Sequence, residues 1–153
     1  MRRALCALAC ALALLAGCSS GGSAAPKEYD VAATAQALRD SGAFSQELEA
    51  LDADMVSAYL GLETEPEEAA VYTSLEGGYE ELAVLKMASE DDAKAALEAV
   101  QAHVKAQRDT EADVQYKPGD LPKLESAVTR QAGKTVLLVV ADDYDKVQAA
   151  LEP

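Results

Sequence analysis

The 153-residue chain contains no tryptophan, one phenylalanine and one histidine, His103. Its three cysteines, Cys6, Cys10 and Cys18, all lie close to the first residue. Nucleophilic catalysis of the Ser/His/Asp or Cys/His kind needs a base beside the nucleophile, and His103 is the only histidine that could supply it. A closed zinc site would need three carboxylates beside this one histidine. We therefore interpret His103 as a residue at the border of an apolar helix face, and we predict no catalytic residue, no metal ligand and no cofactor.

Basic residues are also few, since 13 Lys and Arg stand against 27 Asp and Glu and the formal net charge is −14. Nucleic-acid binding needs a basic face that neutralises phosphates, so we expect no nucleic-acid partner. A protein partner attracted by this charge should be basic. Half of the residues are apolar and 26% are charged. This balance is typical of a globular chain with a buried core, and the length indicates a single domain.

The longest apolar run extends only from Ala4 to Gly17, which is too short for a membrane-spanning helix. Arg2 and Arg3 precede it, and this arrangement is typical of a signal peptide. The run ends in a segment that resembles the lipobox of bacterial lipoproteins, in which small residues precede a cysteine whose thiol takes a diacylglyceryl group: Leu15-Ala16-Gly17-Cys18. We therefore predict a lipid-anchored membrane protein with Cys18 as the lipid attachment site, acylated by palmitate or a similar fatty acid.

These features divide the chain into three parts. Residues 1–17 are expected to be a lipoprotein signal peptide, and residues 18–29 the lipidated cysteine with a flexible tether rich in glycine and serine. Residues 30–153 are expected to form the single folded domain. Two acyl chains on one residue are enough for stable anchoring in a membrane.

Two helices are expected first in the folded part. Asp30 can cap a helix with apolar Val31, Ala35 and Leu38, which ends near Gly42. Ser45 can cap a second helix that ends at Gly61, because apolar residues follow it at spacings of three and four: Leu48, Leu51, Met55, Val56, Tyr59 and Leu60.

From Ala69 the pattern changes to hairpins. Strands are expected at 69–75 and 80–87, joined by the turn Glu76-Gly77-Gly78-Tyr79, and a long helix capped by Ser89 should follow them. After a loop at 109–122, a second pair of strands is expected at 126–131 and 134–141, followed by a short helix at 143–151. The predicted fold class is α+β: two N-terminal helices, then a tandem strand-strand-helix pair that forms a four-stranded antiparallel sheet. Both later helices should lie on one face, and the strand at Val136 to Ala141 should be covered on both sides.

Short segments spread over most of residues 30–151 resemble a family of short lipoproteins from anaerobic Gram-positive bacteria, whose domain has no assigned function. They are Gly42-Ala43-Phe44, Glu47-Leu48, Tyr59 with Gly61-Leu62, Ala70-Val71-Tyr72, Glu81-Leu82-Ala83-Val84-Leu85-Lys86 and Lys123-Leu124-Glu125. The resemblance implies lipidation on the outer face of a single membrane. It implies no catalytic residue.

Two clusters of carboxylates are the remaining candidates for a functional site. Glu90-Asp91-Asp92 and Asp142-Asp143-Asp145 lie at the starts of two expected helices, where negative charge complements the helix dipole. This structural role is sufficient to explain them, whereas Asp143-Tyr144-Asp145 supplies only a fragment of a calcium loop. The leading hypothesis is a non-enzymatic, membrane-tethered module that binds a protein or peptide. The alternative is a lipoprotein that binds a small ligand or a cation with its acidic surface.

Overall fold

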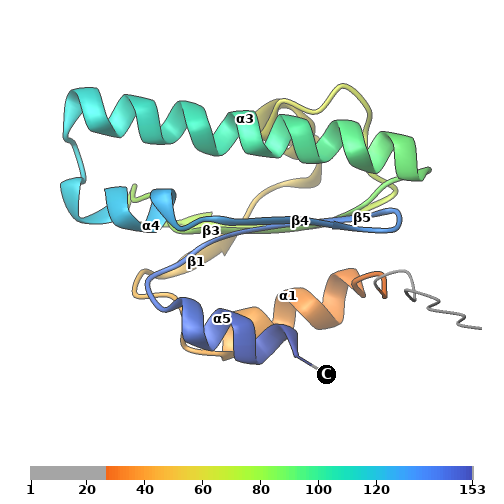
Figure 1. Cartoon of the computed structure of the whole chain (residues 1–153), viewed down its shortest axis with the longest axis horizontal. Coiled ribbons are helices and arrows are strands. Elements are labelled where there is room, and N and C mark those ends of the chain that lie inside the picture. The colour runs from red at the N-terminus through yellow and green to blue at the C-terminus, as the bar shows by residue number, and fades with distance from the viewer. Residues whose placement is uncertain (1–26, 153) are drawn as a thin grey trace, which may run out of the picture.

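The computed structural model describes residues 27–152, in which a five-stranded antiparallel sheet lies between two layers of helices (Figure 1). The strand order is β1-β2-β3-β5-β4. The elements follow one another as α1 (Val31–Asp40), β1 (Leu48–Ala50), η1 (Ala53–Met55), α2 (Val56–Leu60), β2 (Glu68–Ser74), β3 (Glu81–Lys86), α3 (Glu90–Val114), η2 (Pro118–Asp120), α4 (Leu121–Glu125), β4 (Val128–Ala132), β5 (Thr135–Val140) and α5 (Tyr144–Leu151).

The predicted signal peptide, Cys18 and the tether up to residue 26 lie outside the described residues. Within 27–152, no helix has the length and hydropathy that a membrane crossing requires.

Local patterns predicted both hairpins and the starts of α1, α3 and α5 correctly, but not the helix expected from Ser45. Asp30, Ser89 and Asp143 each accept a backbone N–H at the start of α1, α3 and α5. Gly77 and Gly133 adopt positive φ angles of 68° and 55° in the two hairpin turns, a conformation that glycine adopts without steric cost. Every residue of β5 is buried, as expected for a strand with helices on both sides.

The predicted four-stranded sheet is wrong, because the segment that was expected to begin the second helix forms a fifth strand. Leu48–Ala50 pairs antiparallel with the outer edge of β2, and only Val56–Leu60 is α-helical. The apolar spacing that suggests a helix from Ser45 is also met by a short strand followed by one helical turn. Pairing decides between the two, since without β1 the backbone groups along the edge of β2 would have no strand partner.

The expectation that both later helices share a face is also wrong. Helix α3 packs on one face of the sheet together with α2 and α4, whereas α5 packs on the other face beside α1 (Figure 1). The physical reason lies in β3 and β5, whose side chains are apolar on both faces except near the strand ends. A sheet with two apolar faces needs two helical layers, and the side chains alternate between them. One layer receives Ala83, Leu85, Val136, Leu138 and Val140, and the other receives Leu82, Val84, Leu137 and Val139.

Candidate functional site

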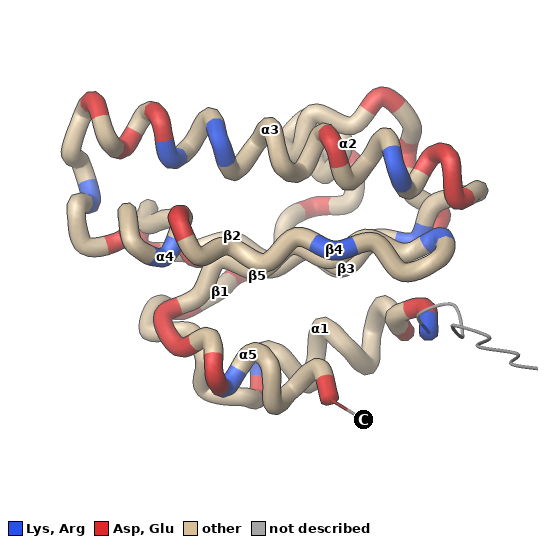
Figure 2. Tube along the Cα trace, viewed as in Figure 1, with Lys and Arg blue, Asp and Glu red and all other residues tan. Residues whose placement is uncertain are grey.

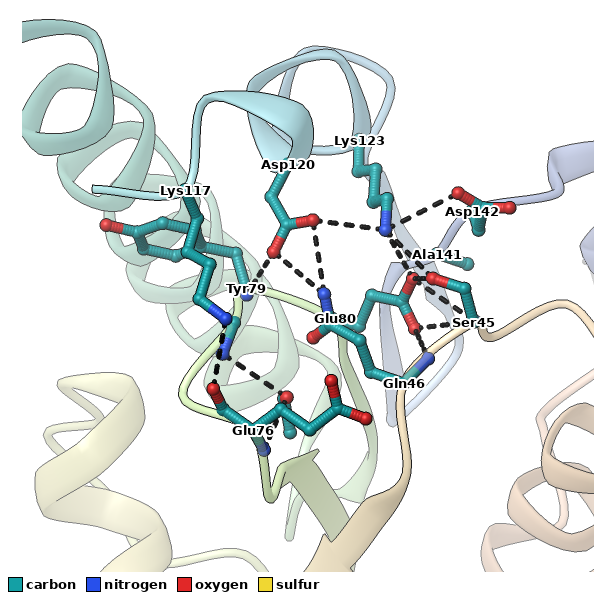
Figure 3. A network of polar contacts seen from close by, with 12 residues as sticks. Ser45, Gln46, Glu76, Tyr79, Glu80, Lys117, Asp120, Lys123, Ala141 and Asp142 are labelled. Atoms are coloured by element: carbon teal, nitrogen blue, oxygen red, sulfur yellow. Dashed lines mark hydrogen bonds and ion pairs between the residues drawn. The ribbon is translucent and has the colours of Figure 1, made fainter. Parts of the chain in front are cut away.

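Three segments that are far apart in the sequence meet at one end of the sheet. They are residues 42–46 after α1, residues 75–79 between β2 and β3, and residues 115–120 after α3, and we call the surface that they form the loop end. Hydrogen bonds of three buried carboxylates, Glu80, Glu111 and Asp120, connect these segments to one another and to the sheet. Figure 3 shows Glu80 and Asp120 with their partners.

Glu80 holds residues 42–46 against the start of β3. Its carboxylate is fully buried and accepts the backbone N–H groups of Ser45 and Gln46, each at 2.9 Å. It also accepts the Ser45 hydroxyl at 2.6 Å and the Lys123 ammonium at 2.7 Å. A buried carboxylate is tolerated only when hydrogen bonds and a counter-charge compensate for its lost hydration. Glu80 has both.

Asp120 joins all three loop segments. Its carboxylate accepts the backbone N–H of Tyr79 at 3.0 Å and the side-chain amide of Gln46 at 2.9 Å. Burial raises the pKa of Asp120, but the N–H of Tyr79, the amide of Gln46 and the ammonium of Lys123 outweigh it and hold the pKa below its usual value.

Lys123 is the cation at the centre of the network. Its Nζ lies 2.7 Å from Glu80 Oε1, 3.1 Å from Asp120 Oδ1 and 3.4 Å from Asp142 Oδ1, and Figure 3 shows it between these groups. Burial lowers the pKa of Lys123, but the contacts with Glu80 and Asp120 outweigh burial, so the net shift is upward. The side chain is only 12% exposed, so water screens these ion pairs weakly.

The segment after α3 is held in a less common backbone conformation. The expected loop at 109–122 is mostly helical: α3 continues to Val114, and Gln115 ends it with a φ of 54°. The buried carboxylate of Glu111 accepts the backbone N–H of Lys117 at 2.7 Å. Lys117 in turn donates its ammonium to the backbone carbonyl of Glu76 at 3.1 Å, which connects α3 to the β2–β3 turn.

Large apolar side chains are exposed on this fixed framework. Leu75, Val114 and Tyr116 are 53%, 66% and 66% exposed. Leu75 and Tyr116 belong to the loop end, and Val114 is the last residue of α3, directly before it. The Tyr116 hydroxyl lies against Gly77, which places the ring beside the β2–β3 turn. Within residues 27–152, the fourth large apolar residue with comparable exposure is Met55, in η1. Loops often carry binding residues, and apolar side chains exposed together on a surface are typical of protein-binding sites.

The loop end lies far from the point where the described chain begins. Glu28 accepts the backbone N–H of Lys134 at 2.7 Å, and the Tyr29 N–H donates to the Thr135 hydroxyl at 3.0 Å. These bonds fasten the first residues to the β4–β5 turn, at the end of the sheet opposite α4 (Figure 1).

A second polar cluster surrounds His103. Its Nε2 lies 3.1 Å from both carboxylate oxygens of Glu81, and the Tyr59 hydroxyl donates to the same carboxylate at 2.7 Å. Burial raises the pKa of Tyr59, and the neighbouring Glu81 raises it further. The His103 side chain is 12% exposed and lies within hydrogen-bond distance of the buried Glu81 carboxylate. Among the described side chains, no serine or threonine hydroxyl is hydrogen-bonded to His103.

The acidic clusters lie where helix starts were expected. Glu90, Asp91 and Asp92 occupy the first turn of α3, Asp143 caps α5 and Asp145 follows in its first turn (Figure 2). No three His, Cys, Asp or Glu side chains in residues 27–152 come together in a way that could hold a metal ion.

Sequence reasoning missed the buried carboxylates of the loop end. The available signal was Glu80-Glu81, an acidic pair at the start of an otherwise apolar strand. The structure gives these two neighbours different partners, Lys123 for Glu80 and His103 for Glu81.

A family model described as Domain of unknown function (DUF4358) matches residues 40–141. The matched range includes the three loop segments, Glu80, Glu111 and Lys123. Neither the curated proteins nor the solved structures contain a match to this chain.

Proposed function

Because the chain belongs to the DUF4358 family, which is defined by a domain of unknown function, we propose its role from its own residues: a lipid-anchored, non-enzymatic module that binds a protein partner through the loop end. The observation that carries this proposal is the set of exposed apolar side chains at and beside the loop end, Leu75, Tyr116 and the last α3 residue Val114, next to loops held by buried carboxylates. Because the loops are already ordered, little conformational entropy would be lost when a partner binds.

The proposed anchor is a lipid on Cys18, at the outer face of the cytoplasmic membrane. The support is the segment Leu15-Ala16-Gly17-Cys18 directly after an apolar run with two arginines ahead of it. The acidic net charge of −14 would be repelled by an anionic membrane surface, so the domain should stand away from the bilayer. A cysteine-to-alanine change at position 18 should abolish metabolic labelling with a fatty acid, and persistent labelling of Cys18→Ala would exclude this anchor.

The charge also indicates the kind of partner. An acidic domain attracts basic proteins, and such attraction increases the association rate most at low ionic strength. We therefore propose a basic protein or peptide that covers Tyr116 and Leu75 with apolar side chains.

Site-specific photo-crosslinking in intact cells tests the binding surface. A photoreactive amino acid at position 116 should give a discrete crosslinked product, whereas the same amino acid at position 55 should not, because Met55 is similarly exposed outside the loop end. After the product is identified, Tyr116→Ala should weaken its binding at least about fivefold, as expected for loss of more than ~1 kcal/mol at a central interface residue. Met55→Ala should leave the affinity unchanged. Equal crosslinking from positions 55 and 116 would contradict the proposal.

A further inference from the structure

A groove lies between the segment after α2 and the first half of α3, away from the loop end. Its volume is about 280 Å³. The apolar lining includes Leu62, buried Met87 and buried Ala96, and the acidic residues Glu63, Asp92 and Glu98 also line the groove. Gly61, with a φ of 69°, ends α2 and turns the chain so that residues 62–64 face α3.

The three carboxylates at the groove differ in whether another side chain contacts them. Asp92 accepts the Ser89 hydroxyl at 2.6 Å, as part of the cap of α3. Within the described part of the chain, Glu63 and Glu98 form no ion pair, and the lining includes no lysine or arginine. Lys94, one helical turn before Glu98, is not part of the lining. The groove therefore combines an apolar wall with negative charge that this part of the chain does not neutralise.

We propose that the groove binds one lysine side chain presented by a partner polypeptide. A lysine side chain has an apolar four-carbon stem that can lie along Leu62 and Ala96, and a terminal ammonium that can reach Glu63 and Glu98. The volume lies below the usual range for drug-sized ligands and is suited to one side chain. The charge of the groove selects a cation, and its apolar wall selects a long aliphatic stem.

The site is separate from the loop end, so the two can be tested independently. The probe is the peptide acetyl-Ala-Lys-Ala-amide, and its comparator is the same peptide with uncharged norleucine in place of lysine. Titration of the full-length protein in detergent, followed by backbone NMR, should give shifts at Leu62, Ala96 and Ala99 with the lysine peptide. The norleucine peptide should bind about two- to thirty-fold more weakly, the range expected for loss of two exposed ion pairs.

Variants of the two unpaired carboxylates complete the test. The double change Glu63→Gln and Glu98→Gln should weaken binding of the lysine peptide by the same roughly two- to thirty-fold factor. The NMR spectrum of the double variant should otherwise match that of the wild-type protein. The matched control is Asp113→Asn, which removes an exposed carboxylate elsewhere on α3 and should leave the affinity unchanged. Equal affinity for the lysine and norleucine peptides would overturn the proposal, as would unchanged binding by a folded double variant or shifts confined to residues outside the groove. Loss of loop-end crosslinking would bear on the proposed function and not on this groove.

Discussion

The network around Lys123 makes a sharp prediction about stability. In Lys123→Met the aliphatic stem is largely preserved, but the ammonium that contacts Glu80 and Asp120 is lost. Both carboxylates are buried, at 0% and 5% exposure, and would then lack their counter-charge. Removing one partner of a buried ion pair costs about 3–5 kcal/mol. Because Glu80 keeps three donors from Ser45 and Gln46, we expect the lower end of this range, about 3 kcal/mol.

Urea unfolding of the purified protein, followed by far-UV circular dichroism, measures this loss. Lys105→Met is the control, because Lys105 also pairs with a carboxylate, Asp109, but is 64% exposed. Such an exposed pair within a helix contributes only about 0.3–0.5 kcal/mol. The transition should shift to lower urea for Lys123→Met with little change in slope.

A double-mutant cycle separates the ion pair from other effects of the substitution. Glu80→Gln removes the buried charge, so Lys123→Met should cost less in that background by at least about 1 kcal/mol. A loss below about 1 kcal/mol for Lys123→Met alone, or additive losses in the cycle, would refute the view that the ammonium compensates Glu80.

Three further predictions concern the stability of the folded domain. Folding lowers the pKa of Asp120, so the stability gained from its carboxylate is present above the unfolded pKa of about 4 and is lost as the pH falls through the folded pKa. Folding raises the pKa of Lys123, so the stability gained from its ammonium is present up to about pH 10 and is lost only as the pH rises further. The stability difference between wild type and Lys123→Met should therefore be level from about pH 4 to 10 and shrink outside this window, and a difference that grows in acid would contradict it. Leu138→Ala, at a fully buried position of β5, should cost about 2–5 kcal/mol in urea unfolding, and a near-zero change would be incompatible with this packing. Tyr59→Phe removes a donor from buried Glu81 and should cost about 1–3 kcal/mol, whereas unchanged stability would mean that His103 alone satisfies this carboxylate.

Much of the local structure follows from the sequence alone. Asp30, Ser89 and Asp143 cap helices because a short polar side chain can accept an N–H from its own next turn. Gly77 and Gly133 identify the hairpin turns for a similarly local reason, since only glycine adopts positive φ without steric cost. The carboxylates of Glu90, Asp91, Asp92, Asp143 and Asp145 lie at the starts of α3 and α5, where the sequence placed them.

The extent of the sheet was decided only by tertiary pairing. Leu48–Ala50 is too short to show a clear two-residue period, and its apolar spacing also fits a helix. It becomes a strand because β2 offers a free edge there, which no local pattern reveals. The placement of α3 and α5 on opposite faces likewise follows from the need to cover both apolar faces of β3 and β5.

The candidate site shows the same division. Glu80 and Lys123 are 43 positions apart, and in the sequence each resembles an ordinary solvated charge. A charge can be recognised as buried and compensated only after the fold has removed it from water and brought its partner within hydrogen-bond distance. Local hydrogen bonds and steric preferences act within a few residues, so the sequence alone determined the starts of α1, α3 and α5, the hairpin turns and the apolar strands. Long-range packing and desolvation decided the fifth strand, the two helical layers and the carboxylate network that holds the loop end.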